Sequence, residues 1–335
     1  MKKYKIAING FGRIGRLTFK YLYSKSNIEI VVINDLTDAK TLAYLLSHDS
    51  SQKKLENFKV SYKDKYLIVN GKEILILSER NPKDLPWKDL GIDLVVESTG
   101  FFLTKEKASL HLEAGAKKVV LSAPVKEKDI KTIVYNVNHK TLTSDDKIIS
   151  GASCTTNCLA PVVNAIDKAF GLKYGLMTTV HAVTNDQRIL DLPHSDLRRA
   201  RSAMNNIIPT TTGAAVAVGY VLPHLNGKLD GIAMRVPVVV GSVVDLTCHL
   251  NSKVSVTEIN QAIKKAANET LGYCEDYIVS TDIIGTHYGS VFDSQFTKVL
   301  NLEDGGQLVK LLSWYDNESS YVSQLVRSVL HFLTI

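Results

Sequence analysis

Hydrophobic residues in the first part of the chain follow two alternating patterns. Short apolar runs typical of buried strands lie at Lys5–Asn9, Glu29–Asp35, Leu94–Val96 and Lys118–Leu121. Between these runs, apolar residues recur at helical spacing, as in Thr41–Leu46 and Lys105–Ala114. Strands that alternate with helices predict an α/β fold with a Rossmann-type, doubly wound parallel sheet.

The second part of the chain has a different pattern. The long runs Ile232–Val240 and Ser242–Leu250 predict neighbouring antiparallel strands, and Ser255–Leu271 predicts an amphipathic helix. Asn185–Asn206 is irregular and rich in arginine, and so long a loop in a compact domain is usually functional or disordered. This mixture of strand runs and helices predicts an α+β domain with a mainly antiparallel sheet.

Three glycines follow the first strand directly and open a helical pattern: Gly10, Gly12 and Gly15. A Gly-x-Gly-x-x-Gly turn between a strand and a helix is typical of dinucleotide binding, because the backbone can approach the pyrophosphate at the start of the helix. Asp35 ends the next strand, where a carboxylate binds the ribose hydroxyls and repels a 2′-phosphate. The alternative for Asp35 is a helix cap or turn residue. Together these residues predict NAD rather than NADP.

The stretch Ser153–Cys158 stands between a short apolar run and a helical pattern, and Gly151 before it predicts a sharp turn. Cys154 is therefore expected in the first turn of a helix, where the positive end of the helix favours a thiolate. A cysteine among small hydroxyl residues predicts a nucleophile; the alternative is a buried structural cysteine. We expect a dinucleotide-binding domain at residues 1–150 and a catalytic domain at 151–316. The closing helix within 317–335 is expected to pack back on the first domain.

Composition narrows the class of protein. With 45% hydrophobic residues, 22% charged residues and a net charge of +6, the chain is ordinary for a globular protein. No basic stripe with interleaved aromatics stands out, so nucleic-acid binding is not expected as its main role. No run is long enough to cross a bilayer, and the four cysteines form no recognised metal pattern. A reducing, cytoplasmic setting without a metal site is the simplest interpretation.

Several motifs together carry a family resemblance. Ile8–Arg16, Ser153–Cys158, His181–Thr184 and Trp314–Glu318 resemble phosphorylating glyceraldehyde-3-phosphate dehydrogenase, and the likeness runs from end to end. The resemblance implies that Cys154 is the nucleophile and His181 the base; the alternative for His181 is a core histidine on a strand. Attack on an aldehyde gives a thiohemiacetal, loss of hydride to NAD leaves a thioester, and inorganic phosphate releases 1,3-bisphosphoglycerate. The resemblance also implies a homotetramer in which the long arginine-rich loop reaches a neighbouring subunit.

The family pattern assigns further contacts to positions of this sequence. Cofactor contacts fall on Gly10, Gly12, Arg13, Ile14, Gly15, Asp35, Arg80, Thr99, Ser122 and Asn317. The seats for the substrate phosphate and for inorganic phosphate fall on Ser153, Thr155, Thr184, Arg199, Thr212, Gly213 and Arg235. Arg198 is the alternative to Arg199, and a loop arginine can also be a solvated surface charge. Arg235 lies within an apolar strand, where an unpaired charge is costly, and this favours a functional partner.

Two departures and two alternative functions stay open at this stage. The family usually has Trp-Gly after Asn317–Glu318, where this chain has Ser319–Ser320, and Val238–Val239 replaces a usual Thr-Pro. These positions carry no group of the reaction, so local packing and subunit contacts are what they put in doubt. Erythrose-4-phosphate dehydrogenase is the alternative activity within the same scaffold. A protein that chiefly binds RNA or a surface partner is the alternative from another class.

Overall fold

The computed structural model describes residues 3–52 and 58–335, and these fall into two compact units. The first unit comprises the described residues up to Ile133, together with His139–Ala152 and Leu325–Ile335. The second comprises Val134–Asn138 and Ser153–Gln324. No helix among the described residues is long and apolar enough to span a membrane.

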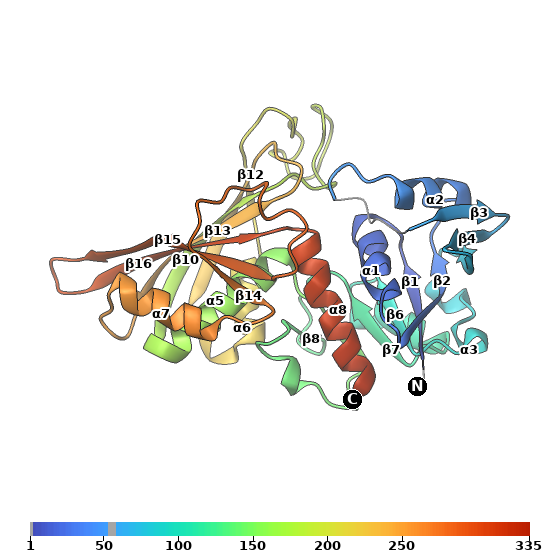
Figure 1. The fold of residues 1–335 in the computed structure, drawn as a ribbon, viewed down its shortest axis with the longest axis horizontal. Coiled ribbons are helices and arrows are strands. Elements are labelled where there is room, and N and C mark those ends of the chain that lie inside the picture. The colour runs from blue at the N-terminus through green and yellow to red at the C-terminus, as the bar shows by residue number, and fades with distance from the viewer. Residues whose placement is uncertain (1–2, 53–57) are drawn as a thin grey trace. The chain divides into compact units, whose positions relative to one another are not determined.

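The first unit is built on a sheet of nine strands within the described residues, in the order β3-β4-β5-β2-β1-β6-β7-β9-β8 (Figure 1). Its strands are β1 (Tyr4–Asn9), β2 (Ile28–Asn34), β3 (Val60–Lys63), β4 (Tyr66–Val69), β5 (Lys72–Leu77), β6 (Leu94–Glu97), β7 (Lys118–Leu121), β8 (Lys131–Thr132) and β9 (Ile148–Ser150). The pairs β5–β2, β2–β1, β1–β6, β6–β7 and β7–β9 are all parallel. The carboxyl ends of these strands therefore share one edge of the sheet, as the alternating pattern predicted.

Helices and two antiparallel hairpins complete this unit. The helices are α1 (Arg13–Tyr23), α2 (Ala39–Ser47), α3 (Trp87–Leu90) and α4 (Lys105–Glu113), with 3₁₀ turns at Pro82–Asp84 and His139–Thr141. Asn70 and Gly71 join β4 to β5 with positive φ at both positions, which is the two-residue turn that Asn-Gly favours. The end of α8 (Ser319–Thr334) also belongs here, where Lys118 Nζ donates to the carbonyl oxygens of Phe332 at 2.6 Å and Ile335 at 2.8 Å.

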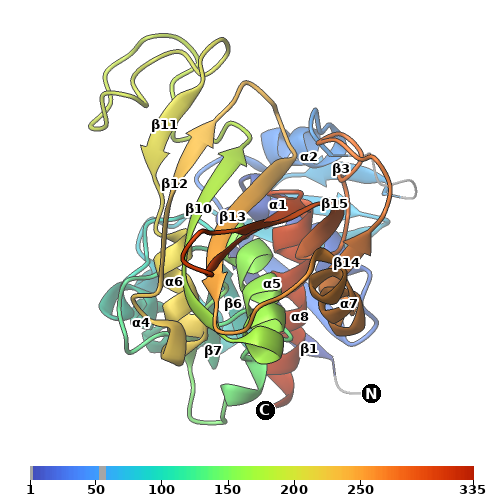
Figure 2. The same ribbon diagram turned by 90° about the vertical axis from the view of Figure 1, so that its left-hand side faces the viewer.

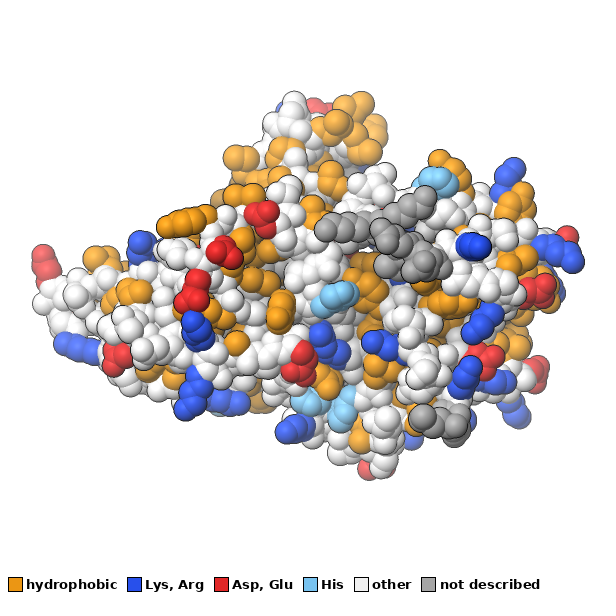
Figure 3. All heavy atoms as spheres, in the orientation of Figure 1, with side chains coloured by type: hydrophobic (Ala, Val, Ile, Leu, Met, Phe, Trp, Pro, Cys, Tyr) orange, Lys and Arg blue, Asp and Glu red, His pale blue; other side chains and the backbone are white. Residues whose placement is uncertain are grey.

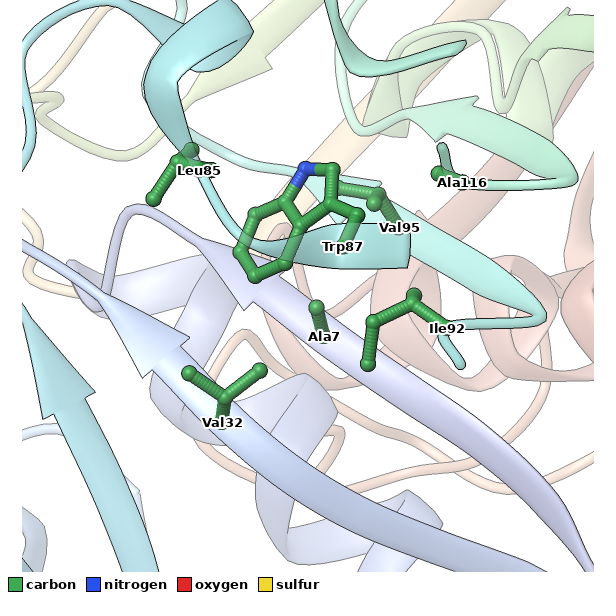
Figure 4. Packing of buried hydrophobic residues seen from close by; sticks show 7 residues of the cluster. All are labelled: Ala7, Val32, Leu85, Trp87, Ile92, Val95 and Ala116. Atoms are coloured by element: carbon green, nitrogen blue, oxygen red, sulfur yellow. The ribbon is translucent and has the colours of Figure 1, made fainter. Parts of the chain in front are cut away.

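Trp87 lies at the centre of one hydrophobic core of the first unit (Figure 4). It packs with residues from β1, β2, β6 and the segments around α3, all of them at least nine-tenths buried: Ala7, Val32, Leu85, Ile92, Val95 and Ala116. The strands are near-continuous apolar runs because helices cover both faces of a parallel sheet. Burial of the indole ring fixes α3 against the sheet, and its ring nitrogen is the one polar atom that this packing has to satisfy.

The second unit is built on a mainly antiparallel sheet of seven strands within the described residues, in the order β11-β12-β10-β13-β16-β15-β14 (Figure 2). Its strands are β10 (Leu172–His181), β11 (Ile208–Thr211), β12 (Leu229–Arg235), β13 (Ser242–Leu250), β14 (Leu271–Cys274), β15 (Ser290–Asn301) and β16 (Gln307–Tyr315). Alternate residues of β13 are buried, which is the pattern of a sheet with one face packed against helices.

Helices α5 (Cys154–Phe170), α6 (Ala214–Val221) and α7 (Val256–Ala266) pack against this sheet. The helix α5 contacts β10, β13, β15 and β16, so its first residue is held against the middle of the sheet. Ser255 and Glu258 form a reciprocal capping box that starts α7. A further 3₁₀ turn spans Pro223–Leu225, and residues 185–206 form the long irregular loop that the sequence predicted.

Three details of the predicted fold are wrong. The strands β12 and β13 are not neighbours: β10 lies between them, parallel to β12 and antiparallel to β13. The strand β12 also ends at Arg235, because residues 236–241, with Pro237 and a positive φ at Gly241, cross over β10 to reach β13. The predicted helix at Ser255–Leu271 ends at Ala266, and Leu271 instead begins β14.

Candidate active site

Cys154 is the first residue of α5, as the sequence predicted. Ser153 is the N-cap, and its hydroxyl accepts a hydrogen bond from the backbone N–H of Thr156 at 3.0 Å. The turn into the helix is made by Ala152, whose φ of 60° is left-handed, rather than by Gly151. A left-handed alanine costs about 1 kcal/mol, a cost that the surrounding packing has to offset.

The sheet register sets His181 and Arg235 beside each other. They are the last residues of the parallel strands β10 and β12 and are paired directly. His181 Nε2 lies 3.4 Å from Cys154 Sγ. On the other side of the ring, Nδ1 lies 2.7 Å from the carbonyl oxygen of Ala182 and 2.5 Å from Arg235 NH1. The structure thus brings together Cys154, His181 and Arg235.

The carbonyl of Ala182 decides the state of the imidazole ring. A carbonyl oxygen can only accept, which favours a proton on Nδ1, whereas Arg235 NH1 can only donate and would favour a bare Nδ1. We assign the ring proton to Nδ1, because Arg235 NH1 has the Ala182 carbonyl as another acceptor, and this leaves Nε2 as an acceptor facing the sulfur. Arg235 NH1 donates to the same oxygen at 3.2 Å. Burial, and then the charge of Arg235, lowers the pKa of His181 to about 3. The ring is therefore neutral at pH 7 and able to accept a proton.

The Cys154 thiol is pulled in two directions. Burial raises the pKa of this thiol above its ordinary value, against the lowering effects of the Arg235 charge and a hydrogen bond from Thr155. The residue keeps a partly exposed surface, which limits the cost of burying a charge there. The start of α5 alone therefore does not give the thiolate expected from the sequence, and with the pKa of His181 lowered to about 3 the thiol keeps its proton in the resting site.

Tyr315 is a part of the site to which the sequence gave no role. Its buried hydroxyl lies 2.8 Å from Thr155 Oγ1 and 2.8 Å from Thr179 Oγ1, so it joins α5 to β10. Its ring meets the His181 ring edge to face, with centroids 5.8 Å apart. The only signal in the sequence was its place in the motif Trp314–Glu318. When Tyr315 donates to Thr155 Oγ1, the hydroxyl proton of Thr155 is left for the Cys154 sulfur or for an anion.

Thr184 and Arg199 meet at a carboxylate that the sequence did not single out. The hydroxyl of Thr184 donates to Asp186, and Arg199 NH1 donates to the other oxygen of Asp186 at 2.8 Å. Arg199 Nε also donates to Thr210 Oγ1 at 2.9 Å. Arg199 is half-buried whereas Arg198 is exposed, which favours Arg199 for a role at this point.

Thr212 and Gly213 lie beside this group, at the start of α6. Arg199 NH2 lies 3.4 Å from the carbonyl oxygen of Thr211, next in the chain to Thr212. Gly213 is the N-cap of α6 and has no side chain to cap the helix, but the N–H of Ala214, the first residue of α6, already donates to Thr212 Oγ1 at 3.2 Å. Ser153 stands at the start of α5, where its hydroxyl also contacts Thr156 Oγ1 at 2.8 Å.

One nitrogen of the Arg235 side chain, Nε, is a buried hydrogen-bond donor that lacks an acceptor among the residues that the structure describes. A buried donor without a partner costs about 1–3 kcal/mol, so a site that retains one gains by binding an acceptor. The guanidinium fork matches phosphate or carboxylate oxygens, and this favours an anion near His181.

Asn317 is held in one orientation. Its Oδ1 accepts from the backbone N–H of Gly241 at 3.1 Å and from the hydroxyl of Ser242 at 3.1 Å. The side-chain NH₂ group is therefore turned away as a donor. A donor in a fixed position suits an amide carbonyl such as that of nicotinamide.

In the first unit, the glycines show that the start of α1 fits a dinucleotide. A Cβ on Gly10 would lie 2.7 Å from the backbone nitrogen of Thr99, and one on Gly15 would lie 2.1 Å from the oxygen of Gly10, so the fold itself requires these two glycines. A Cβ on Gly12 would meet nothing within 4 Å. The packing of the fold thus does not require a glycine at position 12. A ligand that approaches the backbone at this position would account for the glycine.

The other candidate cofactor residues lie along the same edge of the sheet. Arg13 and Ile14 form the first turn of α1, where no side chain caps the N–H groups, and Arg13 NH1 pairs with Asp49 at 2.9 Å. Asp35 follows β2, and its carboxylate accepts from the N–H of Phe11 at 2.7 Å. Three further candidates follow β5, β6 and β7 respectively: Arg80, Thr99 and Ser122. The residues present therefore fit a dinucleotide with free ribose hydroxyls.

The lowered pKa of His181 predicts how stability responds to pH. In the unfolded chain the His181 ring takes up a proton below pH 6.5, whereas in the folded chain it stays neutral down to about pH 3. The contribution of His181 to stability is therefore present above pH 6.5 and is lost as pH falls. At pH 5 this loss amounts to about 2 kcal/mol. We expect His181→Asn to be insensitive to it. Unfolding by urea at pH 7.5 and pH 5 would show the gap between wild type and variant shrink by that amount; an unchanged gap would contradict the buried neutral ring.

Comparison with known proteins identifies the family of this chain. Residues 4–105 match the family model described as the NAD binding domain of glyceraldehyde 3-phosphate dehydrogenase, and residues 153–317 match its C-terminal domain. Proteins named glyceraldehyde-3-phosphate dehydrogenase are similar over nearly the whole chain. That of Mycoplasma pneumoniae is 58% identical, covering 98% of this chain and 97% of the relative; that of Clostridium pasteurianum is 55% identical, covering 99% of each; and that of Streptococcus pyogenes is 53% identical, covering 99% and 98%. The resemblance and the prediction of NAD are thus confirmed, and the chain belongs to the glyceraldehyde-3-phosphate dehydrogenase family of NAD-dependent oxidoreductases that act on an aldehyde group.

Proposed function

We propose that this chain oxidises the aldehyde of D-glyceraldehyde 3-phosphate with NAD and inorganic phosphate, and that Cys154 and His181 carry the reaction. The observation that supports this most directly is the 3.4 Å approach of Cys154 Sγ to His181 Nε2 at the start of α5. A nucleophile within reach of a base that is itself oriented by a third group is the arrangement that covalent catalysis requires. Ala182 O is that third group, because it fixes the proton on Nδ1.

Attack on the aldehyde begins with the thiol proton. His181 Nε2 accepts this proton as Sγ bonds to the aldehyde carbon, and the carbonyl oxygen becomes an oxyanion. The first N–H groups of α5, at Cys154 and Thr155, have no partners within the helix and face this oxygen at the positive helix end. Return of the proton to the oxygen completes the thiohemiacetal.

Oxidation uses the same imidazole a second time. His181 takes the hydroxyl proton of the thiohemiacetal as hydride leaves the carbon, and the carbon becomes the carbonyl of a thioester. Bound NAD supplies the acceptor for this hydride. Asn317 is positioned to hold the amide of the nicotinamide ring, because its oxygen is fixed by Gly241 and Ser242.

Phosphate then cleaves the thioester. A phosphate oxygen attacks the thioester carbonyl, the carbon–sulfur bond breaks, and the thiolate leaves and recovers its proton from His181. The product is the acyl phosphate 1,3-bisphosphoglycerate. We assign Thr184 and Arg235 to the substrate phosphate, and Arg199, Thr212 and Gly213, with Ser153 and Thr155, to inorganic phosphate. The buried Nε of Arg235, which has no partner among the described residues, supports the first assignment, and the contacts of Arg199 with Thr210 and Thr211 beside the start of α6 support the second.

We assign cofactor binding to the first unit, at Gly10–Gly15, Asp35, Arg80, Thr99 and Ser122, and catalysis to the second. The uncapped start of α1 and the unconstrained Gly12 support a pyrophosphate there. The domain boundary near residue 150 and the return of the closing helix to the first domain remain part of this proposal. We also place the protein in the cytoplasm, since its four cysteines are free in the structure.

The direct test is phosphate-dependent formation of NADH by the purified chain. We expect NADH to form from glyceraldehyde 3-phosphate only when inorganic phosphate is supplied, and more slowly from erythrose 4-phosphate. Formation of NADH without dependence on phosphate would contradict the proposed thioester cleavage. A preference for erythrose 4-phosphate would transfer the proposal to the other aldehyde.

We further propose that the chain works as a homotetramer. The loop at 185–206 and the residue beyond it expose large apolar side chains, and Figure 3 shows such side chains gathered over the loop that rises beyond β12. Those more than half exposed are Ile189, Leu190, Leu192, Leu197, Met204 and Ile207. An apolar patch of this extent on a folded chain is typical of a surface that another chain covers.

Charge placed on this loop is expected to break the assembly. The double variant Ile189→Glu, Leu197→Glu puts two carboxylates where the proposed interface would bury them, and we expect the mass in light scattering to fall from four chains toward one. Tyr277→Ser is the matched control, because Tyr277 is 92% exposed but lies outside the loop. Equal masses for the wild type and the double variant would remove the loop from the interface.

A further inference from the structure

Three neighbouring strands of the first unit end in buried polar residues. Asn9 ends β1, Asn34 ends β2 and Glu97 ends β6, and the register pairs Asn9 with both of the others. All three side chains are at least 96% buried. Buried polar groups are nearly always hydrogen-bonded. Here the hydrogen bonds form two chains, and in both chains the donors lead toward the Glu97 carboxylate.

The first line of hydrogen bonds starts at the backbone of Glu79. Its N–H donates to Asn34 Oδ1 at 2.8 Å, and because a backbone N–H can only donate, the amide of Asn34 has one possible orientation. Asn34 Nδ2 then donates to Asn9 Oδ1 at 2.7 Å. This in turn leaves Asn9 Nδ2 to donate to Glu97 Oε2 at 2.5 Å.

The second line starts at the indole of Trp87. Its Nε1–H donates to His111 Nδ1 at 3.0 Å, and an indole N–H can only donate. The proton of the His111 ring is therefore on Nε2, which donates to Glu97 Oε2 at 3.0 Å. Trp87 and His111 are completely buried, so no water competes for these contacts.

The other oxygen of Glu97 holds the turn that follows β6. Glu97 Oε1 accepts from the backbone N–H of Thr99 at 2.7 Å and from its hydroxyl at 2.5 Å. Four donors thus converge on one carboxylate, and none of them can be reversed. The Thr99 turn in turn lies against the glycine loop, because a Cβ on Gly10 would come within 2.7 Å of its backbone nitrogen.

We propose that Glu97 is a positioning residue for the dinucleotide: its carboxylate fixes the Thr99 turn and, through Asn9 and Asn34, aligns it with the loops that follow β1 and β5. This inference rests on the proposed placement of NAD at this edge of the sheet. Glu97 itself is at most 1% exposed and does not touch the cofactor; it acts through the backbone that does. Preorganised loops bind more tightly because less ordering is left to the moment of binding.

The test is the affinity of the full chain for NAD, measured by calorimetry without substrate. Glu97→Gln keeps the shape of the side chain but turns an NH₂ group toward one of the two pairs of donors, so we expect the Kd for NAD to rise about tenfold while kcat at saturating NAD stays within about threefold. Trp87→Phe removes the indole donor together with part of the ring that packs in the core, so we expect a lower unfolding midpoint and a rise in the Kd for NAD of about threefold. Amide exchange of residues 98–101 should be faster in both variants.

Asp93→Asn is the matched control. Asp93 lies just before the opposite end of β6, where it accepts from the N–H of Lys5 at 2.9 Å and from Lys117 Nζ at 2.7 Å. We expect it to lower the unfolding midpoint and leave the Kd for NAD unchanged. The Kd values are compared at a temperature well below the unfolding midpoints of both variants. A Kd for NAD in Glu97→Gln that is no higher than in Asp93→Asn would overturn the proposal. If Glu97→Gln fails to fold, an unchanged Kd in Trp87→Phe overturns it instead. A wild type that does not bind NAD would refute the placement of the cofactor, and with it the inference.

Discussion

Replacing Cys154 with serine is expected to reduce phosphate-dependent NADH formation by at least about 10⁴-fold. A hydroxyl stays protonated at neutral pH and is a far weaker nucleophile than a thiol whose proton can pass to a base 3.4 Å away. The substitution changes one atom at the start of α5 and leaves the cap formed by Ser153 in place. Steady-state kinetics with saturating NAD and phosphate would measure the loss.

Cys274→Ala supplies the control for this change. Cys274 is also partly exposed, but it ends β14 and its sulfur contacts only the carbonyl oxygen of Asp276 among the interactions that the structure resolves. We expect it to retain full activity. The serine variant should still bind NAD with the affinity of the wild type, because Cys154 lies outside the proposed cofactor-binding unit. Substantial turnover by Cys154→Ser would mean that the sulfur is not the nucleophile and that the protein works by another route.

Replacing Arg235 with leucine is expected to lower kcat/KM for the aldehyde by about 10³-fold. The variant loses the buried Nε donor proposed for the substrate phosphate, and it loses the NH1 contact that shares the Ala182 carbonyl with His181. Arg235→Lys restores the charge but not the fork, so we expect it to recover only part of the loss, leaving a deficit of about 10- to 100-fold. The ratio between the two variants separates charge from geometry.

A substrate without its phosphate tests where the arginine acts. Glyceraldehyde lacks the anion, so its kcat/KM should depend on Arg235 much less than that of the phosphorylated aldehyde. Lys310→Met, which removes an exposed cation paired with Asp245 on the same sheet, should leave both values within about twofold. Equal losses for the two aldehydes in Arg235→Leu would assign the arginine to His181 alone.

The strand and helix order followed from hydrophobic spacing in most of the chain. The spacing predicted α5 with Cys154 in its first turn, because a long periodic run leaves one face to bury, and it predicted the strand at Lys118–Leu121 to the residue. It missed β15 altogether and mispaired β12 with β13. Spacing along the chain reports which residues are buried, but the partner of a strand depends on where the connection crosses, and residues 236–241 cross β10.

The site was less accessible to sequence reasoning than the fold. Motifs pointed to Cys154, His181 and Arg235, and the structure brings these together. No pattern marked Asp186, and Tyr315 stood in a motif that gave it no role, because the roles of both residues arise from contacts between segments distant in sequence. The pKa of the Cys154 thiol could not be predicted from the sequence either. A sequence pattern shows where a helix starts, whereas the desolvation that raises this pKa depends on how the site is packed.

The structure accounts for the departure at Ser319 and Ser320. Both residues are at least 99% buried, and both hydroxyls are used: Ser319 donates to the carbonyl oxygen of Thr286 at 3.0 Å, and Ser320 accepts from the N–H of Asp316 at 2.9 Å. Asp316 in turn accepts from the N–H of Ser319 at 2.7 Å. Small hydroxyl residues thus start α8 by capping contacts.

At Arg199, the place proposed for an anion is already taken by a carboxylate of the protein, that of Asp186. Its carboxylate already bonds to the Thr184 hydroxyl and to Arg199, and these positive and polar neighbours hold its pKa below the usual range against the effect of burial. In the proposed phosphate site, a phosphate that binds to Arg199 therefore has to displace the Asp186 carboxylate. The free energy of phosphate binding is then the difference between the interaction of Arg199 with phosphate and its interaction with Asp186. The two anions therefore compete for this arginine.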